Sequence, residues 1–156
     1  MVSKSNIIVP WDFSEYSKSA LQFALEQYEP SNIKVICVLQ PPSPYVPGME
    51  WGPEAEEKAR ANCTQQFFDT QDTSPGLDFV TRFGDPATEI SRYAKDHEAR
   101  FIVISTHGRT GVKRLCMGSV ALKVAAKAKC PILLLPNGWF EAYATKSAKP
   151  DKVESS

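Results

Sequence analysis

The sequence has no excess of charge of either sign. Lysine plus arginine and aspartate plus glutamate number 18 each among 156 residues, so the formal net charge is zero. A protein that binds the nucleic-acid backbone or an anionic membrane surface usually has a basic field that steers the encounter. The balanced composition therefore argues against nucleic acid and membrane as partners.

Long apolar runs are also missing. No segment approaches the roughly 18 apolar residues that a membrane-spanning helix needs. The opening, MVSKSNIIVPW, contains no apolar signal-peptide core. We therefore expect a cytoplasmic protein, and a chain of this length can form one domain with a proper hydrophobic core.

The cysteines lack the spacing of a disulfide framework or a zinc site. Cys37, Cys63, Cys116 and Cys130 form no CxxC pair and no cluster with histidine. We interpret them as reduced cysteines that pack in the core of a cytosolic protein. The sequence predicts no residues that hold a metal ion directly.

Several enzyme signatures are absent too. There is no GxxxxGK[ST] phosphate loop and no GxSxG nucleophile elbow. His97 is expected at a helix end. His107 lies in a glycine-bearing loop, where it either serves as a base or phosphate donor or simply forms hydrogen bonds within a turn. Since no base and nucleophile pair is evident, we assign no catalytic residue and lean towards a protein that is not an enzyme.

What the sequence does have is alternation between strand-like and helix-like patterns. Short apolar runs predict strands at residues 6–10, 33–39, 77–83, 101–104 and 132–135. Amphipathic stretches predict helices at residues 15–28, 54–72 and 87–97, and a fourth that opens at residues 118–119. This alternation implies βαβ units, right-handed crossovers and a parallel sheet. We expect one domain over residues 1–137 and a partly disordered tail over residues 138–156.

The segment of residues 40–53 interrupts this pattern. It contains Pro41, Pro42, Pro44, Pro47 and Pro53, so neither a helix nor a strand can run through it. One interpretation is a loop that its own aromatic residues pin to the body. The other is a lid or a partner surface, since long structured loops often carry function.

The loop before the last helix, residues 105–119, has the features of an anion site. Ser119 is expected to cap that helix, whose lysines come late, at Lys123, Lys127 and Lys129. The free backbone N–H groups of the helix, together with those of the turn at Gly108, can hold phosphate oxygens. The alternative is a tight turn followed by an ordinary capped helix, and spacing alone does not separate the two interpretations.

A carboxylate is expected beside this loop. In open α/β folds, ligands bind beyond the carboxyl ends of the strands, where the winding reverses. Asp12 follows the first strand and residues 105–119 follow the fourth, so both lie at that edge of the sheet. If the two strands are neighbours, the pairing suits a nucleotide, with Asp12 accepting hydrogen bonds from its sugar or base. The alternative is that Asp12 is a second helix cap beside Ser14.

Three separate blocks resemble the universal stress protein family, in the family's order. They are IIVPWDFSEYSKSALQFAL, FGDPATEISRYAKDHEARFIVIS and STHGRTGVKRLCMGSVALKVAAKAKCPILLLP. The resemblance, to a UspA-like domain, covers roughly residues 6–136 and is weakest in the proline-rich segment. It implies an α/β fold of the flavodoxin-like or Rossmann-like kind. The expected sheet is open, parallel and five-stranded, in the order 3-2-1-4-5, with helices on both faces.

The resemblance also implies an ATP site. ATP-binding members have the pattern glycine, two residues, glycine, nine residues, glycine, and then serine or threonine; Gly108 and Gly118-Ser119 fit its second half. Ser105 stands where the first glycine belongs, and it adds a Cβ and a hydroxyl where glycine lets the backbone approach the ligand. The implied cofactor is ATP with Mg²⁺ or Mn²⁺ on its phosphates. The implied site residues are Pro10, Trp11, Asp12 and Val38 at the adenosine, Gly108, Arg109, Gly118, Ser119 and Val120 at the phosphates, and Ser105 and His107 in the loop between them.

As a function, the resemblance implies a small cytoplasmic stress-response protein that binds ATP and acts as a regulatory module. The main alternative is a nucleotide-free dimeric interaction protein of the same family. A slow ATP hydrolase or phosphotransferase is the third, because Asp12 and His107 are both expected near a phosphate.

The last strand, Ile132–Leu135, predicts a homodimer. It contains no charge and no internal proline, so an exposed edge there invites pairing with a second copy about a two-fold axis. The resemblance points the same way, because members of the family commonly dimerise through this strand. The competing possibility is that Trp139, Phe140 and Tyr143, which follow directly, fold back over the edge.

Overall fold

Strands and helices alternate along the chain as predicted. The computed structural model describes residues 6–42, 47–48, 50–70, 75–107, 119–136, 138–139 and 142. The strands are β1 (Ile7–Trp11), β2 (Ile33–Leu39), β3 (Asp78–Phe83), β4 (Phe101–Ser105) and β5 (Ile132–Leu135). The helices are α1 (Glu15–Gln27), α2 (Pro53–Thr70), α3 (Pro86–Asp96) and α4 (Ser119–Lys127), with a short 3₁₀ helix η1 (Pro30–Asn32) before β2.

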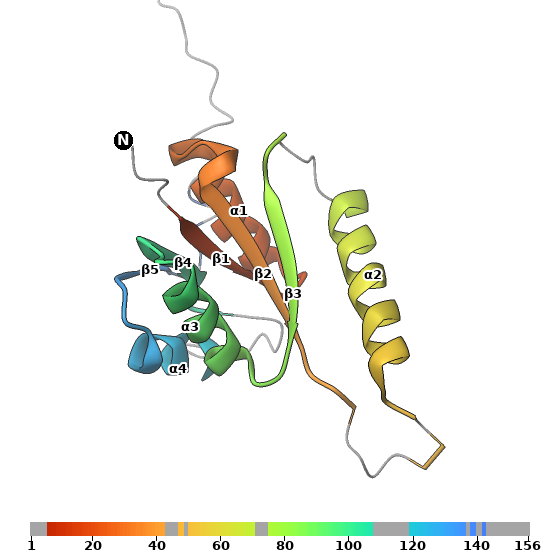
Figure 1. Cartoon of the computed structure of the whole chain (residues 1–156). Coiled ribbons are helices and arrows are strands. Elements are labelled where there is room, and N and C mark those ends of the chain that lie inside the picture. The colour runs from red at the N-terminus through yellow and green to blue at the C-terminus, as the bar shows by residue number, and fades with distance from the viewer. Residues whose placement is uncertain are drawn as a thin grey trace, which may run out of the picture.

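The five strands form one parallel sheet in the order β3-β2-β1-β4-β5 (Figure 1), which confirms the predicted topology. The winding reverses between β1 and β4, which are neighbours in space although two strands separate them in the sequence. This arrangement places the turn after β1 beside the loop after β4.

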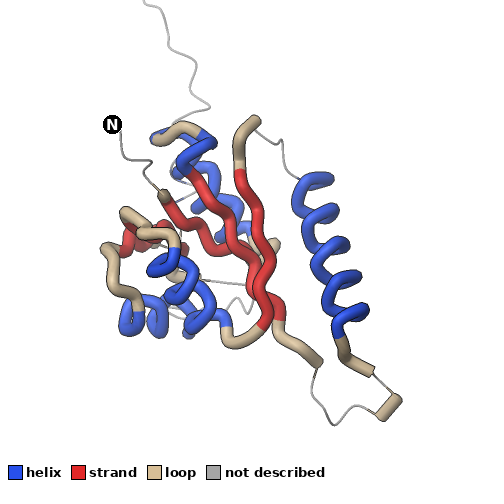
Figure 2. Tube along the Cα trace, in the orientation of Figure 1, coloured by secondary structure: helices blue, strands red, loops and turns tan. Residues whose placement is uncertain are grey.

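Alternation along the strands divides the core into two layers, one on each face of the sheet (Figure 2). On β1, Ile7, Val9 and Trp11 point into the layer beneath α1 and α2, whereas Ile8 points into the layer beneath α3 and α4. On β4, Val103 belongs to the first layer, and Ile102 and Ile104 belong to the second. Because both faces are covered, the central strands β1 and β4 are almost continuously apolar.

The starts of two helices are capped by side chains. The hydroxyl of Ser14 accepts a hydrogen bond from the backbone N–H of Ser17 at 3.2 Å, which caps α1. Asp85 caps α3 in the same way by accepting from the N–H of Thr88 at 3.0 Å, and the Thr88 hydrogen bonds hold the pKa of Asp85 below its ordinary value. Ser119, which was expected to cap α4, is instead the first residue of the helix.

The two edges of the sheet differ. At the β3 edge, the Arg60 guanidinium of α2 donates to the backbone oxygen of Thr81 at 2.7 Å. At the β5 edge, Leu133 is 38% exposed, and the described residues place no further strand there. Trp139 packs against Phe23 of α1, with ring centroids 5.5 Å apart, and joins the core layer under that helix. Phe140 and Tyr143 lie outside the described residues.

The face of α2 that packs on the sheet includes only one of its two adjacent phenylalanines. Cys63 and Phe67 are buried, but the side chain of Phe68 is 42% exposed. Neighbouring residues on a helix point about 100° apart, since 3.6 residues make one turn, so Phe67 and Phe68 cannot both face the sheet.

The proline-rich segment is anchored at its end. The Trp51 ring lies 5.9 Å from that of Phe83 on β3, and its Nε1 donates to Glu56 at 3.3 Å. This contact agrees with a loop pinned by aromatic residues. Tyr45 and Met49 lie outside the described residues.

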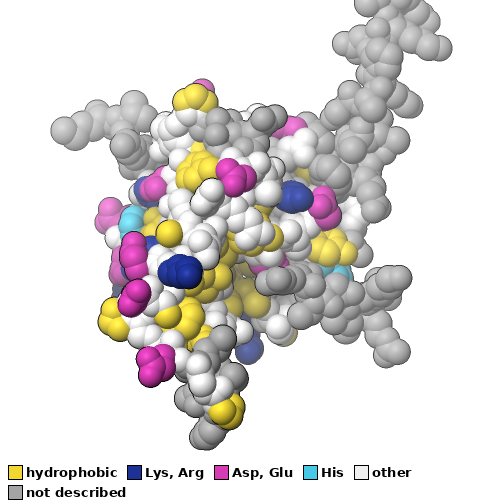
Figure 3. All heavy atoms as spheres, turned by 90° about the vertical axis from the view of Figure 1, so that its right-hand side faces the viewer, with side chains coloured by type: hydrophobic (Ala, Val, Ile, Leu, Met, Phe, Trp, Pro, Cys, Tyr) yellow, Lys and Arg dark blue, Asp and Glu magenta, His cyan; other side chains and the backbone are white. Residues whose placement is uncertain are grey.

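The surface on the α2 side bears acidic and basic side chains interspersed with apolar ones (Figure 3), in keeping with the zero net charge. Among the helices described here, none has both the length and the apolar character that a membrane span requires.

Candidate functional site: a cavity at the carboxyl ends of the strands

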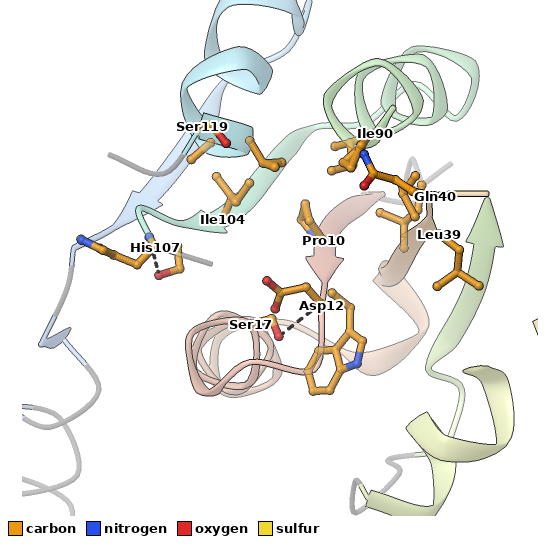
Figure 4. A pocket seen from close by; sticks show the side chains of 16 residues that line it. Pro10, Asp12, Ser17, Leu39, Gln40, Ile90, Ile104, His107 and Ser119 are labelled. Carbon is orange, nitrogen blue, oxygen red and sulfur yellow. Dashed lines mark hydrogen bonds between the residues drawn. The ribbon is translucent and has the colours of Figure 1, made fainter. Parts of the chain in front are cut away.

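A cavity of about 470 Å³ opens at the carboxyl ends of the central strands (Figure 4). Its walls come from the ends of β1, β2 and β4 and from the starts of α3 and α4. This is the point where the winding of the sheet reverses, the usual ligand position in an open α/β fold. The volume is within the range of small-molecule sites.

Most of the predicted site residues meet here. Eight of them line the cavity: Pro10, Trp11, Asp12, Val38, Ser105, His107, Ser119 and Val120. The other three predicted residues, Gly108, Arg109 and Gly118, lie outside the described residues. Trp11 borders the cavity, but its indole ring packs in the layer on the opposite face, 5.0 Å from the ring of Phe67.

Sequence reasoning missed the remaining lining residues, which are Ser17, Ile36, Leu39, Gln40, Pro86, Ile90, Ile104 and Ala121. A signal existed for two of them. Ile36 is two residues before Val38 on the same strand, so strand alternation places both side chains on the same face. Ile104 directly precedes Ser105 and is therefore close to the end of its strand. The helix residues gave no such signal, because sequence patterns do not reveal which part of a crossover helix reaches the strand ends.

Asp12 is held by the turn between β1 and α1. Its Oδ1 accepts a hydrogen bond from the backbone N–H of Ser14 at 3.0 Å and another from the Ser14 hydroxyl. Its own N–H donates to the hydroxyl of Ser17 at 3.4 Å (Figure 4). Phe13 between them adopts a left-handed backbone with φ of 63°, a conformation that side chains other than glycine rarely take. Asp12 therefore both supports the start of α1 and lines the cavity, which joins the two interpretations of this residue.

Ser105 and His107 lie at the end of β4. Ser105 is only 8% exposed, and its hydroxyl accepts from the backbone N–H of His107 at 3.5 Å. The His107 Nδ1 lies 3.0 Å from the hydroxyl of Thr106, and its ring is 5.6 Å from that of Tyr16. These contacts hold the imidazole at the margin of the cavity (Figure 4).

The lining divides by chemistry. Apolar side chains from both sheet and helices form the walls, among them Val38, Ile90 and Ile104. Polar residues line the cavity at the ends of β1 and β4, where Asp12 and Ser105 lie, and at the start of α4, where Ser119 lies. A slot of this kind suits a ligand with a flat apolar ring and a polar extension.

Fold and cavity together define an open, doubly wound α/β protein with a cavity at the reversal point of its sheet. The chain belongs to the universal stress protein family, because the model of that family matches residues 4–136.

Known proteins agree with this assignment. Universal stress protein MJ0531 of Methanocaldococcus jannaschii is 44% identical over 52 residues, which are 33% of this chain and 31% of that protein. The structure of hypothetical protein MJ0577 superimposes with a TM-score of 0.69 at 23% identity, covering 87% of this chain and 98% of that one. A universal stress protein from Archaeoglobus fulgidus, solved in complex with dAMP, gives a TM-score of 0.50 at 21% identity, covering 86% and 98% of the respective chains. At these identities the structural likeness concerns the fold alone.

Proposed function

We propose that the cavity binds an adenine nucleotide and that its physiological ligand is ATP. The observation that supports this most strongly is the convergence of Pro10, Asp12, Val38 and Ser119 on one cavity from three separate parts of the chain. The dAMP complex of the Archaeoglobus fulgidus protein supports the same class of ligand.

In this proposal each part of the lining has a distinct role. The apolar walls around Val38 and Ile90 hold the base, and the Asp12 carboxylate accepts hydrogen bonds from the ribose hydroxyls. Ser119 at the N-terminus of α4 faces the phosphates, where the backbone N–H groups and the helix dipole favour an anion. The loop of residues 108–118, with Gly108, Arg109 and Gly118, completes the phosphate site.

In this proposal the Mg²⁺ or Mn²⁺ ion is bound by the phosphates of ATP. Within the described ranges, no group of three or more histidine, cysteine, aspartate and glutamate side chains is placed to hold a metal ion. The protein's contribution is therefore the position of the triphosphate, and the ion supplies positive charge against it.

Mass spectrometry of gently purified protein tests the proposal. We expect an adenine nucleotide to be released on denaturation, in a fixed ratio to the chain. A protein that releases no nucleotide, and that also takes up none from a nucleotide mixture, would contradict it.

Ser105→Gly is expected to tighten ATP binding. The Ser105 side chain is almost fully buried at the cavity, and removal of its Cβ lets the ligand approach the backbone. We expect a gain of about 3- to 10-fold, or about 0.7–1.4 kcal/mol, in a calorimetric titration. Ser105→Ala is the matched control, since it keeps the Cβ and removes only the hydroxyl. Weaker binding in both variants would show that the hydroxyl contacts the ligand, and equal affinities in all three proteins would place position 105 outside the site.

A second candidate function, a nucleotide-free dimeric interaction protein, is favoured by the open edge at β5. We propose a homodimer through Ile132–Leu135, whether or not nucleotide is bound.

Leu133→Glu is expected to give a monomer in light scattering at micromolar concentration, because Leu133 is exposed at this edge. Leu122→Glu is the control, since Leu122 is 56% exposed on α4 and should leave the dimer intact. A wild-type protein that is already monomeric would rule out the β5 dimer.

We further propose that the chain is a cytoplasmic stress-response module, with the domain at residues 1–137 and a tail at residues 138–156.

Slow ATP hydrolysis ranks below simple binding. His107 lines the cavity, but the hydroxyl 3.0 Å from its Nδ1 belongs to Thr106, which is not among the lining residues.

A further inference from the structure

Cys37 and Cys63 lie in the same core layer, away from the nucleotide cavity. Cys37 is on β2 and Cys63 on α2, and both belong to the cluster beneath α1 and α2. Both are reduced thiols and buried, with 3% and 6% of their surfaces exposed. Nothing in the proposed nucleotide site uses either sulfur.

The sheet register brings the two cysteines together. Trp11, Cys37 and Thr81 form one row across β1, β2 and β3, because Trp11 pairs with Cys37 and Cys37 pairs with Thr81. On α2, Cys63 and Phe67 are four residues apart and share one helix face. The Phe67 ring packs on Trp11 at 5.0 Å. The same face of α2 therefore covers the row, and it places Cys63 in the same buried cluster as Cys37, near enough for the Cys37 thiol to lower the pKa of Cys63.

The two thiols are not equivalent. The thiol of Cys37 lowers the pKa of Cys63 below its ordinary value, although desolvation opposes the shift. Because the thiolate is the nucleophilic form of cysteine, the lowered pKa marks Cys63 as the attacking sulfur of the pair.

We propose that Cys37 and Cys63 form an oxidation site at which a peroxide converts the two thiols into an intramolecular disulfide between β2 and α2. The Cys63 thiolate attacks one peroxide oxygen, the O–O bond breaks, and Cys63 becomes a sulfenic acid, while the leaving hydroxide takes up the proton that the thiol had released and departs as water. The Cys37 sulfur then attacks the Cys63 sulfur, and the sulfenic oxygen leaves with a proton as a second water. Two electrons pass from the sulfur pair to the peroxide, and a dithiol reductant reverses the change.

The disulfide would act as a clamp on α2. This helix packs mainly on the edge strand β3, and the new bond would tie it to β2 as well. Val38, the residue after Cys37, lines the proposed nucleotide cavity. The disulfide would therefore restrain a strand whose end forms part of the proposed ligand site.

Peptide mapping of the folded full-length protein tests the proposal. After treatment with hydrogen peroxide in modest excess and blocking of remaining thiols with N-ethylmaleimide, we expect one linked peptide pair containing Cys37 and Cys63. Dithiothreitol should separate the pair, and the oxidised protein should melt about 5–10 °C higher than the reduced protein.

Three variants sharpen the test. In Cys37→Ala, a dimedone adduct should accumulate at Cys63, because the sulfenic acid has no resolving thiol. In Cys63→Ala, Cys37 should stay reduced, and Cys130→Ala should leave the linked pair unchanged. Peroxide treatment of the wild type that oxidises other cysteines first, or that yields no Cys37–Cys63 link, would overturn the proposal. So would a link that leaves the melting temperature unchanged.

Discussion

Phe67→Ala is expected to lower the free energy of unfolding by about 3–5 kcal/mol, the range for truncating a buried phenylalanine. Phe67 is fully buried and stacks on Phe79 of β3 with ring centroids 4.2 Å apart. Its ring also meets Trp11 of β1 edge-on, so this side chain joins α2 to two strands. Urea denaturation measures the loss, which should appear as a lower midpoint with an unchanged slope.

Phe68→Ala is the matched control for this experiment. The residue is the same type, adjacent in the sequence and on the same helix, but its side chain is 42% exposed. We expect a loss below about 1.5 kcal/mol, since surface substitutions rarely have large effects. Similar losses in the two variants would show that α2 does not pack through Phe67.

Asp12→Asn is expected to weaken ATP binding by about 10- to 100-fold. The substitution keeps the shape of the side chain and its acceptor oxygen for Ser14, and it removes the charge that strengthens hydrogen bonds from the ribose. Hydrogen bonds to a charged group contribute about 1.5–3 kcal/mol, which corresponds to this range of affinity. Calorimetric titration of both proteins measures the ratio.

Asp85→Asn provides the control for charge. Asp85 also follows a strand at this edge of the sheet, but it caps α3 and does not line the cavity. Asparagine caps helices about as well as aspartate, so the fold and the ATP affinity should change little. If Asp85→Asn weakened ATP as much as Asp12→Asn, the effect would come from the general field at the sheet edge and not from contact with the sugar.

The sequence predicted the sheet because its signals were local and repeated. The run 33–39 is apolar except for Lys34 and lies between helix-breaking residues, and β2 occupies those residues. The helices predicted to start at residues 15 and 87 start at Glu15 and Pro86 in the structure. The order of the strands came from the family resemblance, since periodicity alone does not determine which strands are neighbours.

The site was predictable where it depends on strand ends and less so elsewhere. Asp12 and Ser105 follow directly from the position of β1 and β4. Ile90 and Ala121 reach the cavity from helices, and their approach depends on the path of each crossover. The contact between Cys37 and Cys63 depends in the same way on how α2 sits over the sheet, which no local pattern encodes.

Isothermal titration of the dialysed wild-type protein with ATP and Mg²⁺ tests the central claim most directly. The account predicts saturable binding of one ATP per chain, with affinity that falls in Asp12→Asn and stays in Asp85→Asn. Binding should also raise the melting temperature, because the ligand prefers the folded state. The absence of saturable heat and of any shift in melting temperature at millimolar ATP would contradict a nucleotide site in this cavity.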